Sequence, residues 1–249
     1  MTQASRTAVG NAVLLVGGLA VCWQALYWLI GDIALRSPAQ TMAYAIELLS
    51  GDMLWPHARE SLTAFAVALA IATLAGLGIG FILGYARGAA AIFEPMLTAL
   101  YSIPKITLYP ILLLLFGLGM SAKIAFGAIH GIIPIALFTL NGVRNVRPVL
   151  VKTGRVLKLG RMAMVRSVLF PAAMPEIFTG LRVGFSLTLI GTLLGEMFAS
   201  QRGIGFLMMN AIGLHNIDLI MALTLMIMVV SATVSSVLLY YDRKLRARL

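Results

Sequence analysis

The sequence predicts an all-α, polytopic membrane protein with six transmembrane helices, because of its composition and its long charge-free stretches. Of its 249 residues, 60% are hydrophobic and 11% are charged, and the mean hydropathy is +0.96. A soluble domain averages about 45–50% apolar and about 25% charged residues. A soluble fold of this length could not bury so much apolar surface, so lipid must cover much of it. The composition excludes a disordered chain and an ordinary cytosolic enzyme, and the one cysteine, Cys22, excludes an intrachain disulfide.

Four stretches without Asp, Glu, Lys or Arg are long enough to cross a membrane, which takes about 20 helical residues. They are 7–31, 61–86, 124–143 and 219–241. Two further apolar stretches are interrupted: Pro104, Lys105 and Pro110 predict one kinked or broken span, and Arg182 and Glu196 lie in the other. The six predicted spans are 8–30, 61–86, 93–117, 122–143, 176–199 and 217–241.

The first predicted span has the alternative of being a cleaved signal peptide. Its apolar run is longer than the usual ~7–15 residues, and Trp23, Tyr27 and Trp28 suit a membrane interface, so a retained span is favoured. Between the first two spans, 38–50 is expected to form a short helix outside the membrane. No linker rich in Pro, Gly or Ser divides the chain, so residues 1–249 are expected to form one transmembrane domain.

The basic residues predict the orientation of the spans. The net charge of +10 would suggest nucleic acid in a soluble protein, but basic cytoplasmic loops account for it in a membrane protein, and no nucleic-acid partner is expected. With both termini cytoplasmic, 13 basic residues lie inside and 4 outside. The inner set is Arg6, Arg87, Arg144, Arg147, Lys152, Arg155, Lys158, Arg161, Arg166, Arg243, Lys244, Arg246 and Arg248, and the outer set is Arg36, Arg59, Lys123 and Arg202.

The longest cytoplasmic segment, 144–175 between spans four and five, holds seven basic residues and no acidic one, with apolar residues between them. Such a segment is too polar to cross the membrane and too apolar to be a plain solvated loop. One interpretation is a set of short amphipathic helices that dock onto a cytoplasmic partner. The other is a basic helix that lies on anionic lipid headgroups. Composition alone leaves both open.

Small residues form ridges on two of the predicted spans. At about 100° per residue, the glycines of span five share one face, which allows another helix to approach closely. Span two carries a similar ridge. The predicted packing glycines are Gly180, Gly184, Gly191 and Gly195 in span five, and Gly76, Gly80 and Gly84 in span two.

Four polar residues within the spans are candidates for lining a pathway: Thr188, Thr192, Glu196 and His130. The first three follow one another at intervals of four and form a stripe beside the glycines of span five. Intramembrane polar residues tend to face a cavity. Glu196 could equally hold a structural position near the outer interface, which we favour, and His130 could be a packed, hydrogen-bonded residue.

The sequence contains no motif for catalysis, nucleotide binding or metal binding. There is no Gly-rich loop that ends in Gly-Lys-Ser/Thr, no His-Glu-x-x-His, no nucleophile elbow and no cluster of metal ligands. We therefore expect a chain that is not an enzyme and that binds neither ATP nor a metal itself. A membrane enzyme would need a cluster of acid, base or metal ligands, which the sequence lacks.

The stretch FPAAMPEIFTGLRVGFSLTLIGTLLGEMFASQRGIG, 170–205, resembles the permease subunits of binding-protein-dependent ABC importers. Within them it looks like the nitrate/sulfonate/taurine branch, which shows a Leu-Pro-Ala-Ala-Leu-Pro turn, a Gly-Leu-Arg, a Glu in the next helix and a Gly-Leu-Gly beyond it. In this chain these elements map to 170–175, 180–182, Glu196 and 203–205. Upstream, 102–124 is similar to the branch's Ile-Pro and Phe-Gly-x-Gly elements. The resemblance covers the chain from about residue 60 to its end.

The resemblance implies a type I ABC importer permease in the bacterial inner membrane. It implies a second permease copy, two ATP-binding subunits that hold ATP and Mg, and an extracytoplasmic binding protein that delivers a small solute such as a sulfonate, taurine or nitrate. The alternative is a proton-coupled secondary transporter that uses Glu196, which would leave the basic segment unexplained.

The family's cytoplasmic signature is Glu-Ala-Ala, three residues, then Gly. In this chain it falls on Lys152-Thr153-Gly154 with Lys158 at the glycine position, so the acid, one alanine or both, and the glycine depart from the pattern. The resemblance therefore implies an ATPase contact, with Leu157, Leu159 and Met162 as apolar anchors and an acidic partner surface. The expected contact residues are Lys152, Thr153, Gly154, Arg155, Leu157, Lys158, Leu159, Gly160, Arg161 and Met162.

Overall fold

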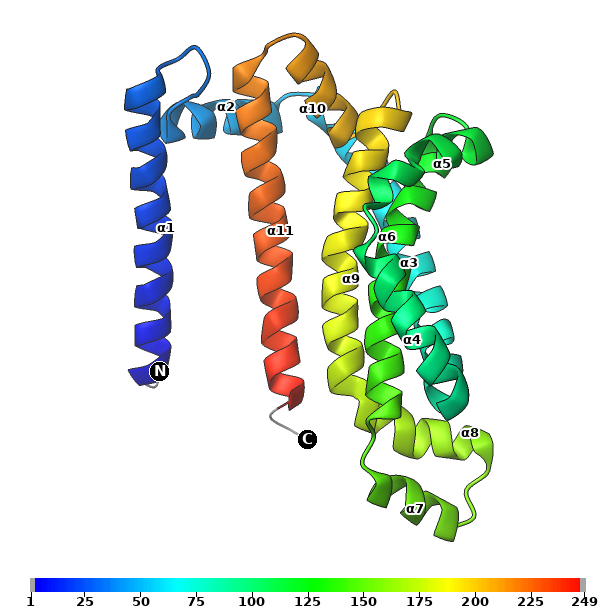
Figure 1. Ribbon diagram of the computed structural model, residues 1–249. Coiled ribbons are helices and arrows are strands. Elements are labelled where there is room, and N and C mark those ends of the chain that lie inside the picture. Colours follow the sequence, from blue (N-terminus) through cyan, green and yellow to red (C-terminus); the bar gives the residue numbers. More distant parts are fainter. Residues whose placement is uncertain (1–2, 247–249) are drawn as a thin grey trace. The chain divides into compact units, whose positions relative to one another are not determined.

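The computed structural model describes residues 3–246, and these are almost entirely helical (Figure 1). Side chains are not described at 3–9, 11–13, 87, 89, 199, 245 and 246. Of the residues in the orientation argument, Arg248 thus lies outside the described residues, as do the side chains of Arg6, Arg87 and Arg246. The chain forms two compact units: one holds the residues up to Trp55 with Met208–Val230, and the other holds Pro56–Leu207 with the residues from Ser231 onward.

The first unit contains α1 (Gln3–Ile30), α2 (Pro38–Ser50) and parts of α10 (Ile204–Gly213) and α11 (Ile217–Arg246). The predicted short helix 38–50 is confirmed as α2, and its cap explains its start. Ser37 Oγ accepts a hydrogen bond from Gln40 N at 3.2 Å, while Gln40 Oε1 accepts one from Ser37 N at 2.8 Å. This capping box satisfies two backbone donors that the helix itself leaves unpaired. Arg36, next to the cap, forms an ion pair with Asp218, with Arg36 Nε 2.6 Å from Asp218 Oδ1. The hydrogen bond to Asp218 raises the pKa of Arg36.

The second unit contains most of the membrane-spanning helices: α3 (Leu54–Tyr85), α4 (Arg87–Ser102), η1 (Lys105–Leu108), α5 (Tyr109–Phe116), α6 (Met120–Arg144) and α9 (Phe170–Ala199). Among the described residues, four helices are long and apolar enough to cross a membrane, or five if a bent pair counts as one span. They correspond to predicted spans two, four, five and six, and the bent pair corresponds to span three. The apolar part of α1, Leu14–Ile30, is shorter than these, so span one stays a prediction.

Predicted span three, 93–117, is broken, in agreement with the sequence prediction of a kinked or broken span. Its two helices, Ala90–Ser102 and Lys105–Phe116, meet at 86° around Pro104; a proline lacks the backbone donor that a continuous helix needs there. Helix α9, which contains predicted span five, begins at Phe170, before the predicted start of the span at 176. Pro171 stands in its first turn, where the missing N–H costs nothing.

Helix α6 is the centre of the second unit, with α3 against one side and α9 against another, and we call these three helices the three-helix core. A Cβ atom added to Gly80 would lie 2.5 Å from Thr139 Cβ, and one added to Gly191 would lie 2.7 Å from His130 Nδ1. The backbones therefore approach more closely than any larger residue permits. All seven predicted packing glycines face α6 in this way: Gly76, Gly80, Gly84, Gly180, Gly184, Gly191 and Gly195.

Candidate functional site

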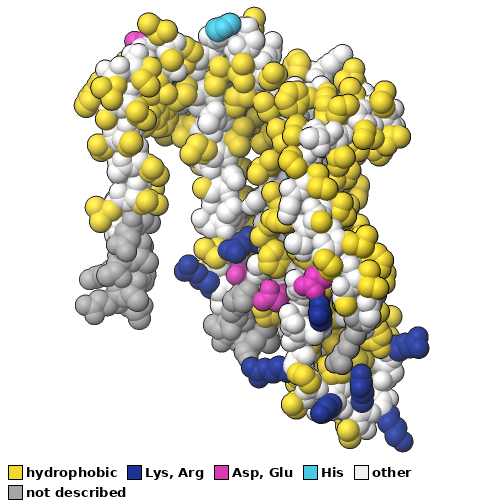
Figure 2. All heavy atoms as spheres, viewed as in Figure 1, with side chains coloured by type: hydrophobic (Ala, Val, Ile, Leu, Met, Phe, Trp, Pro, Cys, Tyr) yellow, Lys and Arg dark blue, Asp and Glu magenta, His cyan; other side chains and the backbone are white. Residues whose placement is uncertain are grey.

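The segment 144–175, which we call the coupling segment, folds into α7 (Pro148–Val156), a turn at 157–160, α8 (Arg161–Met164) and a π-helical stretch, Val165–Leu169, that leads into α9. It lies at one end of the second unit, below α6 and α9 in Figure 1. Figure 2 shows basic side chains gathered over this end. Because 145–175 contains no carboxylate, these charges have no acidic neighbour within the segment itself.

The turn after α7 is a Schellman motif built around Lys158. Leu159 N donates to Gly154 O at 3.0 Å and Lys158 N donates to Arg155 O at 2.9 Å, which are the two bonds that define this motif. Lys158 has a φ of +50°, a left-handed conformation in which glycine is the usual residue. This backbone gives a physical reason for the glycine that the family signature places at this position.

Gly154 and Leu159 lie in the packed interior of the coupling segment. Gly154 is buried, and a Cβ added there would lie 2.8 Å from Met164 Sδ and 3.5 Å from Leu159 Cδ1. A small residue at 154 thus lets α7 and α8 pack together, in agreement with the alanine of the family signature. Leu159 is half-buried at this contact and lines an apolar groove of about 290 Å³ between α7 and the start of α9.

Several apolar side chains of the coupling segment point away from the protein. Leu157 is 66% exposed and Met162 is 78% exposed. Val156, which sequence reasoning did not select as an anchor, is 80% exposed and is the neighbour of Leu157 in the chain. The remaining expected contact residues that are exposed are Lys152, Thr153, Arg155, Lys158, Gly160 and Arg161.

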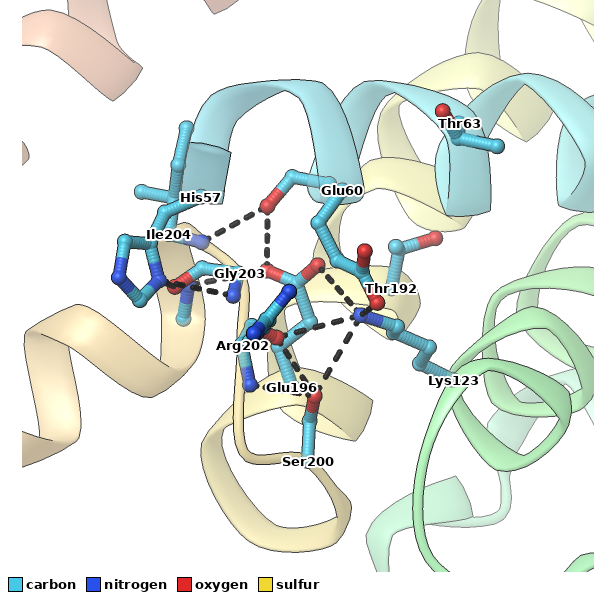
Figure 3. Close-up of polar contacts among 12 residues, drawn as sticks. His57, Glu60, Thr63, Lys123, Thr192, Glu196, Ser200, Arg202, Gly203 and Ile204 are labelled. Carbon is cyan, nitrogen blue, oxygen red and sulfur yellow. Dashed lines mark hydrogen bonds and ion pairs between the residues drawn. The ribbon is translucent and has the colours of Figure 1, made fainter. Parts of the chain in front are cut away.

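A polar network that we call the end network lies at the opposite end of the three-helix core (Figure 3). Glu196 is fully buried, and its Oε2 accepts hydrogen bonds from Ser61 Oγ at 2.7 Å and Gly205 N at 3.0 Å. Lys123, also fully buried, lies with Nζ 3.6 Å from Glu196 Oε1 and 3.1 Å from Glu60 Oε1. Lys123 also donates to the Arg202 carbonyl at 3.2 Å. The network ties α3, α6, α9 and the turn after α9 to one another.

The Gly-Ile-Gly turn at 203–205 fits directly onto Glu196. Gly203 has a φ of +125°, and a Cβ there would overlap the Glu196 carboxylate. Gly205 passes so close to Leu193 that a Cβ would overlap its carbonyl oxygen. Ile204 N donates to Ser61 Oγ at 2.7 Å, and Gly203 N donates to His57 Nδ1 at 3.1 Å. The glutamate and the two glycines, 7–9 residues apart in the sequence, are thus one structural element.

Sequence reasoning placed Lys123 outside the membrane and gave it no partner. The sequence could have suggested this pairing. A carboxylate as deep in an apolar helix as Glu196 needs a cationic partner, and few basic residues lie near that side of the predicted spans. The pairing itself joins positions 73 residues apart, which periodicity does not reveal.

Of the other pathway candidates, Thr188 and Thr192 on α9 face α6, and His130 lies on α6 itself. Thr192 lies against Gly127 and Thr188 against Gly131, and Thr188 Oγ1 makes no hydrogen bond. His130 is 8% exposed, and its Nδ1 lies 2.7 Å from the Phe126 carbonyl oxygen. With Glu196 in the end network, the structure brings these residues together along the contact between α6 and α9. Their role in lining a pathway stays a prediction. Among the described residues, no group of three or more His, Cys, Asp and Glu side chains is arranged to hold a metal ion.

Comparisons with known proteins agree on one family. Residues 72–247 match the model of the "Binding-protein-dependent transport system inner membrane component" family. The chain is 27% identical over 219 residues to a "Probable ABC transporter permease protein" of Haemophilus influenzae, covering 88% of this chain and 89% of that protein. It is 28% identical over 212 residues to the taurine transport system permease protein of Escherichia coli, covering 81% and 77%. It is 32% identical over 215 residues to the nitrate import permease protein of Synechocystis sp., covering 83% and 76%.

A solved structure shares the fold. A chain of the MetNI methionine ABC transporter, in a structure of its inward-facing conformations, superimposes with a TM-score of 0.61 at 19% identity. The match covers 76% of this chain and 92% of that one. At this identity the likeness establishes the fold alone.

Proposed function

The chain belongs to the family of binding-protein-dependent transport system inner membrane components, and on this premise we propose how it contacts its partners and what it carries. It is a multi-pass inner-membrane permease subunit of an ABC importer, and it is a transport component rather than a catalyst. Such a permease works with ATP-binding subunits and a solute-binding protein. ATP and Mg belong, in this proposal, to two separate ATPase subunits.

The ATPase docks on the coupling segment, through the exposed apolar side chains around the turn at Lys158. A docking helix needs apolar anchors that fill a groove on the partner, and Leu157 and Met162 are exposed as such anchors require. The basic side chains around them favour an acidic partner surface, most directly opposite Lys152 and Lys158. Closure of the ATPase dimer moves this segment, and the three-helix core transmits the motion as a rigid body.

The test uses aspartate variants of exposed residues, Leu157 and Met162, and of one half-buried residue, Leu159. Leu157→Asp and Met162→Asp change surface residues, so the permease folds and the binding protein still docks, but solute no longer stimulates ATP hydrolysis. Leu159→Asp also disturbs the contact with Gly154. The measurement is ATPase activity and uptake in reconstituted vesicles, with Leu157→Met as the matched control. Normal stimulation in both aspartate variants would mean that the segment is a lipid-surface helix.

The complete architecture is part of the same proposal. Six spans over residues 1–249 form one transmembrane domain with both termini cytoplasmic, and two copies of the chain pair to enclose the pathway. The support is the bias of basic residues toward one set of loops and the membership of a permease family. The pathway candidates Thr188, Thr192, Glu196 and His130 would act in this dimer when α6 and α9 move.

The solute is a small anion of the sulfonate, taurine or nitrate type. Relatives named for taurine, aliphatic sulfonates and nitrate carry this part of the proposal. The test is to purify the cognate binding protein and identify the molecule that leaves it on denaturation; a molecule with neither a sulfonate nor a nitrate group would contradict the assignment.

A further inference from the structure

A cavity of about 450 Å³, open to its surroundings over much of its extent, lies in the second unit between the end of α4, the middle of α9 and the C-terminal half of α11. This volume falls within the range of about 300–1,000 Å³ that small-molecule sites occupy. Its polar lining comes from five residues, and the rest of the lining is aliphatic. The polar residues are Tyr101, Arg182, Ser186, Ser235 and Ser236.

Arg182 is the charged residue of this lining, and it stands well inside the helical span Arg161–Phe198. Among the described residues, no carboxylate lies within ion-pair distance of its guanidinium, and its N–H groups make no hydrogen bond there. A charged side chain within a span faces protein or a water-filled cavity and normally has a partner. The five donors of Arg182 are therefore unused where the cavity opens.

A second cation, Lys105, contacts one residue of the lining, Tyr101. Lys105 lies at the 86° break between the two helices of the bent pair and is only 9% exposed. Its Nζ donates to the Tyr101 carbonyl at 3.0 Å and lies 5.4 Å from the centre of the Tyr101 ring. No ion pair joins it to a carboxylate in the described part of the chain. Broken helices beside a cavity are where membrane transporters commonly bind their solutes.

We infer that this cavity is the membrane-embedded site for the solute and that it binds the head group of an organic sulfonate. Arg182 would bind two oxygens of the sulfonate, in the same two-pronged way in which arginine side chains bind carboxylates and phosphates. Serine hydroxyls from α9 and α11 supply further donors, and the aliphatic lining accommodates the carbon part of the molecule. The inference rests on the proposed importer function, which it deepens by naming the residues that select an anion.

The direct test measures the charge preference of the cavity with thiol reagents. Ser235→Cys is introduced into a Cys22→Ser background of the complete importer in nanodiscs. Two methanethiosulfonates are compared, one carrying an ethylsulfonate and one a trimethylammonium group. Each rate is divided by the rate of the same reagent with a small thiol in solution. On this scale the sulfonate reagent reacts faster, and Arg182→Gln lowers the ratio of the two rates about tenfold, as expected for the loss of one nearby charge. Ethanesulfonate at millimolar concentration protects the cysteine only while Arg182 is present.

Two controls keep the result independent of folding yield. Arg182→Lys keeps the charge and retains most of the preference, while Arg59→Gln, at the exposed start of α3 and away from the cavity lining, leaves the ratio unchanged. Because both reagents are applied to the same sample, a lower yield does not alter the ratio. An unchanged ratio in Arg182→Gln, or protection by ethanesulfonate that does not depend on Arg182, overturns the inference.

A second measurement separates this inference from the importer function. Stimulation of ATP hydrolysis by the binding protein tests the importer, and uptake of labelled taurine tests the cavity. Arg182→Gln is expected to keep the stimulated hydrolysis and to reduce uptake at least tenfold. Equal uptake in Arg182→Gln and wild type overturns the cavity assignment while the importer function stands. Absence of stimulation in wild type overturns the importer function, whatever the labelling ratio.

Discussion

The three-helix core and the coupling segment satisfy their polar and apolar groups in opposite ways. The core closes on itself: glycine ridges from α3 and α9 face α6, and the charges of Lys123 and Glu196 are buried within one hydrogen-bonded network. In the coupling segment, Arg144 pairs with Glu94, but the other six basic residues form no ion pair among the described residues, and Leu157 and Met162 lie on its surface. A subunit that transmits force needs both a rigid part and an exposed surface that a partner can bind. The three-helix core is the rigid part, and the exposed apolar residues of the coupling segment form the surface.

The largest difference between the two ends of the second unit should be their side of the membrane. In a Cys22→Ser background, an impermeant thiol reagent applied to spheroplasts should label Arg59→Cys, near the end network, and not Lys152→Cys in the coupling segment. The reason is the excess of basic residues at the end that carries Lys152. Permeabilisation should make Lys152→Cys reactive. The reverse pattern would invert the topology.

Removal of the buried cation should destabilise the core strongly. Lys123→Met leaves the Glu196 carboxylate buried without its ion-pair partner, and breaking a buried pair typically costs about 3–5 kcal/mol. We expect a clearly lower melting temperature of the detergent-solubilised complex. The double variant Lys123→Met/Glu196→Gln should recover much of the loss, because the unpaired charge is then gone. Equal melting of Lys123→Met and the exposed control Arg59→Met would show that the end network contributes nothing.

Glycine substitutions offer a matched test on one helix. A side chain at Gly80 would meet Thr139 and the Ala136 carbonyl, whereas nothing lies within 4 Å of a Cβ at Gly78. Gly80→Leu should therefore overpack the contact with α6 and cost about 1–3 kcal/mol, seen as a lower yield of assembled complex. Gly184→Leu should behave in the same way on α9, and Gly78→Leu should assemble normally. Similar yields for all three variants would mean that these faces do not hold the core together.

The smallest expected effect lies in the turn of the coupling segment. A non-glycine residue in the left-handed conformation costs about 1–2 kcal/mol, and Lys158→Gly removes this cost. The gain in stability is partly offset because glycine is more flexible in the unfolded chain. A net stabilisation of about 1 kcal/mol or less should slow amide exchange at Leu157 and Leu159. Lys158→Val, with a branched side chain in the same conformation, should accelerate it. Faster exchange in Lys158→Gly would contradict the assigned turn.

The sequence alone predicted features that local chemistry determines. The short helix 38–50 and the break near Pro104 in span three were both predicted from the sequence. The glycine ridges predicted close packing, but not that one helix, α6, receives both of them, because a ridge does not identify its partner. The pair of Lys123 with Glu196 depends on how three helices meet. In the candidate site, the mapping of the family glycine onto Lys158 pointed to the turn, while the inward position of Leu159 follows from the Gly154 contact.

In the proposed mechanism the coupling segment is an exposed docking surface for the ATPase, and the three-helix core is already packed without that partner. The most direct measurement is amide hydrogen exchange of the permease in nanodiscs with and without its ATPase subunits. We expect peptides covering 148–164 to exchange their amide hydrogens more slowly when the ATPase binds. Peptides covering 120–144 of α6 should exchange equally slowly in both states. Unchanged exchange over 148–164 on formation of an active complex would contradict it.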